Sequence, residues 1–346
     1  MELLSSSDQD LKRAAKAIGE GKLVAFPTET VYGLGADAFN VKALARVFEA
    51  KNRPRFDPLI IHIADKKSLF DLVDTAVMNV LSRERLDILT EELWPGPLTL
   101  VLPKKTEVPD LATAGLPSVA VRFPSHELAQ KIIRLSSCKV AAPSANPFGY
   151  LSPTRTEHVI SQLGDKVDYI VDGGRSTVGL ESTVLDISGE LPSILRPGGT
   201  TREAIETLIG PVELCAAAHL EVSHNVNQGD APASPGMLKS HYAPACPLFL
   251  VGREELARLP DKGAEGRLYF SSPGGENKVP KKRYRVLSER GDLLEAAANL
   301  FEMLHELDGL GLAFIYAEKA PEGGLGEAIN DRLYRAAASK AGGPLP

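Results

Sequence analysis

The chain has 346 residues, of which 43% are hydrophobic and 24% charged, and its formal net charge is −6. This length exceeds one ordinary hydrophobic core and predicts a soluble globular protein of two domains. The acidic balance argues against a generally basic nucleic-acid-binding protein, although it leaves room for a local basic patch. The three cysteines do not predict a disulfide framework, and the N-terminus does not resemble a signal peptide. No apolar run reaches the length of a membrane span. We therefore expect a cytoplasmic protein.

Residues 8–210 alternate between helix and strand patterns, which predicts an α/β or α+β unit with a large sheet. Ser7 and Asp10 have the spacing of a capping box, as have Thr200 and Glu203, and Asn40 can cap another helix. Two more helices are expected at about Ala76–Leu89 and Glu127–Ser136. Strands are expected at Leu23–Phe26, Leu59–Ile63, Leu98–Leu102, Ser118–Phe123, Lys139–Ala142, Tyr169–Asp172 and Thr183–Ile187.

The composition changes after Pro211. Residues 215–245 are poor in core-forming side chains and predict a linker. A second α/β pattern follows it. Its expected strands are Leu248–Val251, Arg267–Phe270, Tyr284–Val286 and Leu312–Ala317, and its expected helices are Leu293–Leu307 and Ala328–Ala338. We therefore predict domains at 1–212 and 246–346, joined by a linker or lid at 213–245.

The most informative stretch is Phe26-Pro-Thr-Glu-Thr-Val-Tyr-Gly-Leu-Gly35, followed by Lys51-Asn-Arg-Pro-Arg-Phe-Asp-Pro-Leu59. A strand, a polar loop with two glycines, a helix and a basic loop follow one another here. Backbone N–H groups and cationic side chains converge in such loops, so the stretch predicts a site for a small anionic ligand.

Five cationic residues lie beside rigid turns: Lys51, Arg53, Arg55, Arg122 and Arg196. Arginine at such positions can bind a phosphate or a carboxylate with two parallel hydrogen bonds. A single arginine of this kind is more often a surface residue with local salt bridges. Five of them together favour a binding site.

For several other polar residues, the sequence is compatible with a structural role as well as a functional one. Ser144 and Asn146 lie in Pro143-Ser-Ala-Asn-Pro147, where a ligand contact or a plain turn is favoured over covalent catalysis, because no G-x-S-x-G elbow surrounds the serine. His62 alone would be a structural histidine. The seven histidines lack metal-ligand spacing, and no Walker P-loop is present, so neither a zinc site nor that mode of ATP binding is expected.

The expected linker ends in Ser234-Pro-Gly-Met-Leu-Lys-Ser-His-Tyr-Ala-Pro244. Prolines alone would make this segment a stiff connector. The closely spaced Lys239, His241 and Tyr242 instead favour a strap that docks on another part of the molecule.

Together these motifs resemble the Sua5/YrdC/YciO family, in its two-domain branch of threonylcarbamoyl-AMP synthases. The resemblance covers almost the whole chain in the family's order. It rests on Pro27–Leu34, Lys51–Pro54 with Pro58-Leu59, Leu93–Thr99, Val121–Pro124, Pro143–Asn146, Glu181–Val184, Arg196–Gly198, Ser240–Pro244 and Gly324–Leu333.

The resemblance implies a twisted open α/β sheet followed by a smaller Rossmann-like domain. It also implies that L-threonine, bicarbonate or CO2, and ATP with Mg2+ react to threonylcarbamoyl-AMP and pyrophosphate. The product would pass to a separate transferase complex that makes the t6A modification of tRNA. The resemblance leaves direct tRNA binding open and provides no protein-bound metal.

Site residues are carried over by the same resemblance. Lys51 and Arg53 would stabilise the reacting phosphates electrostatically, with no covalent nucleophile. The ATP-binding set is Lys51, Arg53, Asp57, Ser118, Ser144, Asn146, Ser152, Arg196 and Tyr242. The threonine-binding set is Thr30, Tyr32, His62, Arg122, Ala142 and Ser182.

Two other functions stay open at this point. YrdC-like domains have been proposed to bind double-stranded RNA, which the net acidity disfavours. A carbamoyl-adenylate-forming enzyme of hydrogenase maturation shares this domain, but it would carry acylphosphatase and zinc-finger-like segments that this sequence lacks.

Overall fold

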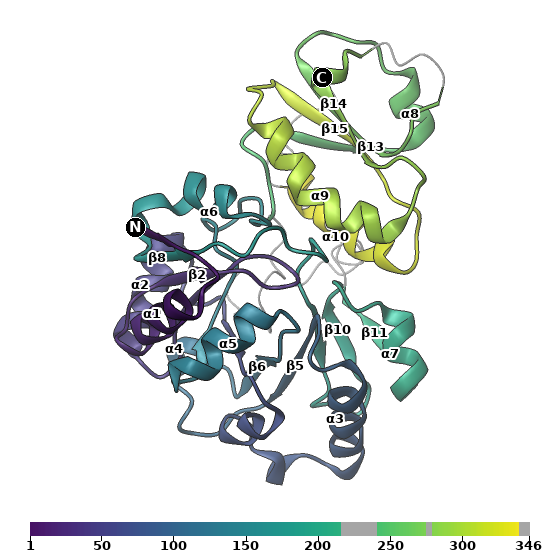
Figure 1. Cartoon of the computed structure of the whole chain (residues 1–346). Helices are drawn as coiled ribbons and strands as arrows, with labels where there is room; N and C mark the ends of the chain where they lie inside the picture. Colours follow the sequence, from purple (N-terminus) through teal and green to yellow (C-terminus); the bar gives the residue numbers. More distant parts are fainter. Residues whose placement is uncertain (216–240, 275–278, 339–346) are drawn as a thin grey trace.

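The computed structural model describes residues 1–215, 241–274 and 279–338, and within them the chain builds two sheets (Figure 1). The 11-stranded sheet has the order β1-β8-β2-β3-β7-β4-β6-β5-β9-β10-β11 and mixes parallel with antiparallel pairs. Its strands are β1 (Glu2–Leu4), β2 (Val24–Phe26), β3 (Gly33–Asp37), β4 (Ile60–His62), β5 (Leu98–Pro103), β6 (Ser118–Arg122), β7 (Val140–Ala141), β8 (Tyr169–Val171), β9 (Thr183–Asp186), β10 (Ser193–Arg196) and β11 (Glu213–Leu214).

Helices cover this sheet, and two of them begin at the predicted caps. The Ser7 side chain accepts the N–H of Asp10, and the Asn40 side chain accepts the N–H groups of Lys42 and Ala43. These caps satisfy amides that have no partner inside the helix. The helices are α1 (Asp8–Gly19), α2 (Val41–Lys51), α3 (Val80–Leu93), α4 (Asp110–Thr113), α5 (Glu127–Ser136), α6 (Thr156–Leu163) and α7 (Arg202–Ile209).

Two predicted helix starts are wrong. The helix expected at about Ala76–Leu89 is a short 3-10 turn at Thr75–Val77 followed by α3, because Asn79 caps α3 by accepting the N–H of Ser82. Helix α7 is capped by Thr201 and not by Thr200. The amide of Thr200 instead donates to Oγ1 of Thr183, which ties the loop before α7 to β9.

Strand β3 was expected to be a polar loop because of its glycines. It pairs antiparallel with β2, and Gly35 lies against the ring of Phe26. A Cβ atom at position 35 would lie 2.5 Å from Cε1 of Phe26, so only glycine fits this strand position.

The second sheet has the order β12-β15-β13-β14, and all of its neighbouring strands are parallel. Parallel strands need crossover connections, which here include helices, and the result is the predicted Rossmann-like unit. The predicted fold class is thus confirmed for both units. The elements are β12 (Leu248–Val251), α8 (Arg253–Arg258), β13 (Glu265–Ser271), β14 (Tyr284–Ser288), α9 (Leu293–Asp308), β15 (Phe314–Glu318) and α10 (Leu325–Ala338).

The predicted linker begins later than position 213, because β11 still belongs to the first sheet. Most of that linker, residues 216–240, lies outside the described residues. Within the described part of the chain, no helix combines the length and the apolar character needed to cross a membrane.

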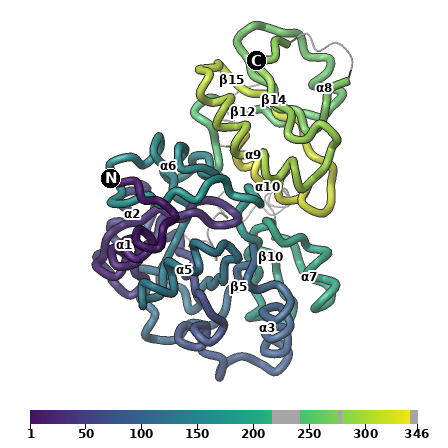
Figure 2. The backbone as a smooth tube through the Cα atoms, in the orientation of Figure 1, coloured from purple at the N-terminus to yellow at the C-terminus, as the bar shows by residue number. Residues whose placement is uncertain are grey.

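Helices α9 and α10 lie on the side of the second sheet that faces the first unit (Figure 2). Polar contacts cross between the units. Among them, Nε of Arg155 lies 2.7 Å from Glu302, and the ring of His158 stacks on that of His305 with 3.8 Å between centroids. One hydrophobic cluster also spans both units, since Val31, Leu151 and Leu180 of the first pack with Leu300 and Phe301 of the second. The two units therefore share a hydrophobic core.

Candidate active site

A small cavity of about 50 Å³ lies where β4, β6 and β10 end. Its wall brings together nine of the predicted site residues from distant parts of the sequence. From the threonine-binding set it contains Thr30, His62, Arg122, Ala142 and Ser182, and from the ATP-binding set Arg53, Ser144, Arg196 and Tyr242. Val31, Ile60, Pro143, Glu181 and His241 complete the wall.

The register of three strands places His62 and Arg122 side by side. His62 on β4 pairs with Arg122 on β6, and Thr99 on β5 lies on the other side of Arg122. Nδ1 of His62 lies 3.2 Å from the carbonyl oxygen of Ile60, which only accepts, so Nδ1 carries the hydrogen. Burial first, and then the nearby Arg122 charge, lower the pKa of His62 to about 3. A neutral ring with a free lone pair on Nε2 therefore lines the cavity.

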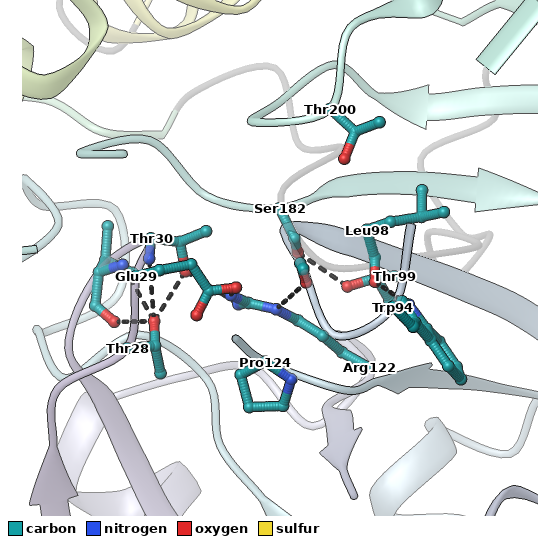
Figure 3. A network of polar contacts seen from close by, with 12 residues as sticks. Thr28, Glu29, Thr30, Trp94, Leu98, Thr99, Arg122, Pro124, Ser182 and Thr200 are labelled. Carbon is teal, nitrogen blue, oxygen red and sulfur yellow. Dashed lines mark hydrogen bonds and ion pairs between the residues drawn. The ribbon is translucent and has the colours of Figure 1, made fainter. Parts of the chain in front are cut away.

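Arg122 is held by two residues of the loop after β2 (Figure 3). Its Nη1 donates to Oγ1 of Thr30 at 2.8 Å, and its Nη2 lies 2.6 Å from Oε1 of Glu29. Burial raises the pKa of Glu29, but the Arg122 charge and the hydrogen bonds from Arg122 and from backbone amides together outweigh burial and keep that pKa below its usual value. The guanidinium plane is thus fixed at the wall of the cavity by a buried ion pair.

Arg196, the last residue of β10, fixes the loop that leads into β9. Its Nη2 donates to the carbonyl oxygen and to Oγ of Ser182, at 2.9 and 3.2 Å. Oγ of Ser182 also lies 2.7 Å from Oγ1 of Thr99 (Figure 3). Ser182, predicted for threonine, and Arg196, predicted for ATP, are therefore direct neighbours.

Arg53 contributes the third guanidinium group of the wall. Its Nη2 lies 2.9 Å from Oδ2 of Asp57 and donates to the carbonyl oxygen of Pro58. Burial lowers the pKa of Arg53 and raises that of Asp57, in each case against the attraction of the partner. Asp57 thus lies behind Arg53 as its counter-ion and is not itself part of the wall.

Lys51 is placed differently from the prediction. Its side chain is buried, and Nζ donates to the carbonyl oxygens of Ser144 and Asn146, each at 2.5 Å. Burial, followed by the repulsion of Arg53, holds the pKa of Lys51 well below its usual value. In this arrangement Lys51 supports the 144–146 loop and does not line the cavity. Arg55, the fifth cationic candidate, is exposed.

Two further predicted residues lie away from the wall. Tyr32 is buried in the core, and its hydroxyl donates to the carbonyl oxygen of Gly174 at 2.7 Å, so its predicted threonine contact is not part of this arrangement. Ser118 starts β6 opposite Pro103, at the other end of the strand from Arg122.

Asn146 and Ser152 form a layer behind the wall. Nδ2 of Asn146 donates to the carbonyl oxygens of Pro147 and Tyr150, which shapes the loop after β7. Oγ of Ser152 donates to Oε1 of Glu181, which does line the cavity. Ser152 thus orients a wall residue, whereas Asn146 shapes the loop that follows Ser144, and neither residue lines the cavity itself.

The end of the predicted strap closes the cavity. Tyr242 is 2% exposed and adopts a left-handed backbone conformation with φ of 62°, which costs a non-glycine residue about 1–2 kcal/mol. The amide of Ala243 donates to the carbonyl oxygen of Gly149, and the His241 ring packs edge-on against Phe148. The strap is therefore docked on the first unit at its described end.

Sequence reasoning assigned no role to Glu29, Glu181 or Arg332, although all three lie within the motifs used above. Glu29 and Glu181 each pair with a buried arginine beside the cavity. The available signal was their proximity in sequence to predicted ligand-binding residues. A prediction that selects cationic residues as anion ligands does not select the glutamates that pair with them.

Within the described residues, no group of three or more histidine, cysteine, aspartate or glutamate side chains is placed to hold a metal ion. Glu181 lines the cavity and pairs with Arg332, while Glu29 and Asp57 pair with the wall residues Arg122 and Arg53.

Comparisons with known proteins place the chain in a family. A family model described as "Telomere recombination" (Sua5_yciO_yrdC) matches residues 16–198, and one described as "Threonylcarbamoyl-AMP synthase, C-terminal domain" matches residues 200–338. A threonylcarbamoyl-AMP synthase of Bacillus subtilis is 41% identical over 97% of this chain and 95% of its own length. One of Pyrococcus abyssi is also 41% identical, over 94% and 93% of the two lengths.

A solved structure resembles the whole fold. The crystal structure of Pyrococcus abyssi Sua5 complexed with L-threonine superposes with a TM-score of 0.87 at 38% identity, covering 98% of each chain. Both family models, the near-complete coverage by relatives and the shared two-unit fold lead to one conclusion. This chain belongs to the threonylcarbamoyl-AMP synthase family and is an enzyme.

Proposed function

We propose that this enzyme is a nucleotidyltransferase that converts L-threonine, CO2 or bicarbonate, and ATP into threonylcarbamoyl-AMP and pyrophosphate. One observation carries the proposal: a single cavity joins Arg122, Thr30 and His62 to Arg53 and Arg196. The first group suits the carboxylate and polar groups of an amino acid. The second suits phosphates, because arginine binds phosphate oxygens with paired hydrogen bonds.

The chemistry requires two bond-forming steps. The amine nitrogen of threonine attacks the carbon of CO2 and loses a proton, which gives an N-carbamate. An oxygen of this carbamate then attacks the α-phosphorus of ATP, and the bond to the pyrophosphate leaving group breaks. If bicarbonate enters, its dehydration releases one water molecule.

The protein residues would act by position and charge. Arg122 would hold the amino-acid carboxylate, and the neutral Nε2 of His62 would accept a hydrogen bond from the substrate. Arg53 and Arg196 would offset the repulsion between the carbamate and the triphosphate and stabilise the leaving group. Mg2+ would arrive with ATP and add charge neutralisation, held largely by phosphate oxygens and water.

The docked end of the strap would keep water away from the reacting groups. Tyr242 and His241 are buried, and both form part of the cavity wall. Water would hydrolyse both the carbamate and the mixed anhydride of the product, so exclusion of water favours yield. A separate transferase complex would then transfer the threonylcarbamoyl group of the product to tRNA and release AMP.

Pyrophosphate release provides the test. The purified protein is supplied with ATP and Mg2+, and threonine and bicarbonate are omitted in turn. The proposal expects pyrophosphate together with an adenylate, and only when both are present. Release of ADP and phosphate, or a rate indifferent to threonine, would contradict it.

A further inference from the structure

One arginine of the second unit contacts residues that line the cavity of the first. Arg332 lies on α10, and its side chain is 1% exposed. Its Nε lies 2.7 Å from Oε2 of Glu181, and its Nη2 donates to the carbonyl oxygen of Pro197 at 3.0 Å. Its Cζ lies 4.8 Å from the centre of the Tyr242 ring. One guanidinium group therefore contacts three separate segments of chain.

Each of these segments carries a residue of the cavity wall. Glu181 lines the cavity and directly precedes Ser182, Pro197 directly follows Arg196, and Tyr242 lines the cavity itself. Oε1 of Glu181 accepts the hydrogen bond from Ser152. Displacement of Arg332 would consequently release several wall groups together.

The two loops under Arg332 are packed too closely to move independently. The amide of Gly199 donates to the carbonyl oxygen of Glu181 at 3.0 Å. A Cβ atom at Gly198 would lie 2.4 Å from that same oxygen, so the backbones are in direct contact. A shift of the 197–199 loop is therefore transmitted to Glu181 and Ser182.

Arg332 is itself held firmly within α10. Its Nη1 lies 2.7 Å from Oδ2 of Asp331, which also pairs with Nε of Arg335 at 3.0 Å. The carbonyl oxygen of Arg335 accepts the amide of His241. Buried charges keep a fixed geometry because an unpaired one is costly, and this cluster links α10 to both the strap and the cavity.

We propose that Arg332 is a positioning residue of the active site, through which the second domain holds Glu181, the 197–199 loop and Tyr242 in the arrangement that binds ATP. This inference rests on the proposed function and extends it to the second domain. Ser152, Arg196 and Tyr242, which surround Arg332 and its partners, all belong to the ATP-binding set. Of the threonine-binding set, Ser182 directly follows Glu181 and adjoins this contact. Thr30, His62 and Arg122 are instead held by hydrogen bonds within the first unit, so threonine binding depends less on Arg332 than ATP binding does.

A simpler alternative is that Arg332 only fastens the two domains together. The chain offers a matched control for that role, because Arg155 also makes an ion pair across the interface, with Glu302. Neither Arg155 nor Glu302 lines the cavity. Variants of the two arginines therefore separate loss of docking from loss of positioning.

The test compares Arg332→Met, Arg332→Lys, Glu181→Gln and Arg155→Met in the full-length protein. Pyrophosphate release is measured against ATP and against threonine, with thermal unfolding in parallel. Arg332→Met should raise the KM for ATP by about 10-fold or more, the effect of losing one charge-assisted contact, and that for threonine far less. Arg332→Lys should recover part of the loss. Arg155→Met should leave both KM values near those of the parent, even where it lowers the unfolding temperature.

Coupling through Glu181 gives a second readout. Burial raises the pKa of Glu181, while Arg332 and Arg196 lower it, and the net pKa lies below its usual value. Without Arg332 this carboxylate takes up a proton at higher pH, so Arg332→Met should lose activity at a higher pH than the parent as the solution is acidified. Arg155→Met should keep the parent profile. In a double variant that carries both Arg332→Lys and Glu181→Gln, the ATP KM should rise by less than the product of the two single fold-changes. The reason is that both substitutions act on the same contact.

Three results would overturn the inference: equal ATP KM changes in Arg332→Met and Arg155→Met, an unchanged ATP KM in Glu181→Gln, or fully independent effects of Arg332→Lys and Glu181→Gln. If Arg332→Met fails to fold, the last two comparisons still decide. If the parent releases no pyrophosphate, the proposed function fails instead, and calorimetric ATP affinities of the same variants then test the positioning role alone.

Discussion

Arg122 and Glu29 form a buried ion pair in which 2.6 Å separates Nη2 of the arginine from Oε1 of the glutamate. Arg122 also donates from Nη1 to Thr30, so protein atoms fix both arms of its fork. The Arg122 guanidinium, to which we assign the carboxylate of the amino-acid substrate, thus already binds the carboxylate of Glu29. Substrate binding at Arg122 has to share or replace the Glu29 contact, which makes this pair the first place to test.

Arg122→Ala should raise the threonine concentration needed for pyrophosphate release by about 10- to 150-fold, the equivalent of roughly 1.5–3 kcal/mol for a charge-assisted hydrogen bond. ATP affinity should change little, because Arg122 belongs to the other group of wall residues. Arg122→Lys should rescue only in part, since lysine keeps the charge and loses the paired geometry. Calorimetric titration measures the threonine affinity of each variant. Normal threonine binding by Arg122→Ala would contradict the assignment of Arg122 to the amino-acid carboxylate.

Arg53→Ala should weaken ATP binding about 10- to 150-fold, whereas Arg13→Ala should leave it unchanged. The Arg53 side chain is 4% exposed and lines the cavity, while that of Arg13 is 43% exposed and pairs with Glu2 at the surface. Equal ATP affinities in the two variants would contradict the placement of Arg53.

The Arg53 variant also needs a stability control. Arg53→Ala leaves Asp57 buried without its counter-ion, at a cost of about 3–5 kcal/mol in the free energy of unfolding. Removing both partners, as Arg53→Ala with Asp57→Ala, should restore part of that stability and none of the ATP affinity. Recovery of ATP affinity in the double variant would show that the single variant acted only through misfolding.

The sequence patterns predict most of the elements because their signals are local. Helices α1 and α2 begin at side-chain caps that can be recognised from residue type and spacing, and both are confirmed. The 3-10 turn before α3 and the glycine-rich β3 were missed, because each depends on contacts outside its own segment. Periodicity does not report that Phe26 fills the space beside Gly35.

The site shows the same division. Residue types near turns predicted Arg53, Arg122 and Arg196, and all three line the cavity. Lys51 belongs to the same motif as Arg53, yet its side chain turns to the backbone of the 144–146 loop. Tertiary packing decides the direction of a side chain and its distant contacts, and one sequence does not reveal this packing. The contact between Arg332 and Glu181 is an example.

Tyr242 should act as part of a lid. The cavity holds about 50 Å³ with Tyr242 docked, while typical ligand pockets hold roughly 300–1,000 Å³, so ATP entry requires the strap to move. ATP with threonine should slow proteolysis near Lys239, which lies outside the described residues, and Tyr242→Ala should remove that protection. Ligands that leave the parent's cleavage rate unchanged would rule out a lid.

Acid should destabilise the protein partly through His62. Its pKa is about 3 in the folded protein, lowered by burial and then by Arg122, against an ordinary value of 6.5. Between these two values the unfolded chain binds a proton that the folded chain does not. The stabilisation is therefore complete above about pH 6.5 and is lost as the pH falls toward 3, with a slope of up to about 1.4 kcal/mol per pH unit.

His62→Asn should remove that slope, because asparagine does not titrate. Urea unfolding of the parent and the variant at about pH 7 and about pH 5 measures the difference. The parent should lose more free energy of unfolding between the two conditions than the variant does. His158, whose pKa is also about 3, remains in both proteins and contributes equally to each, so it cancels from the comparison. Parallel losses in the two proteins would mean that His62 is protonated when folded, and the neutral acceptor assigned to it at the substrate cavity would then be wrong.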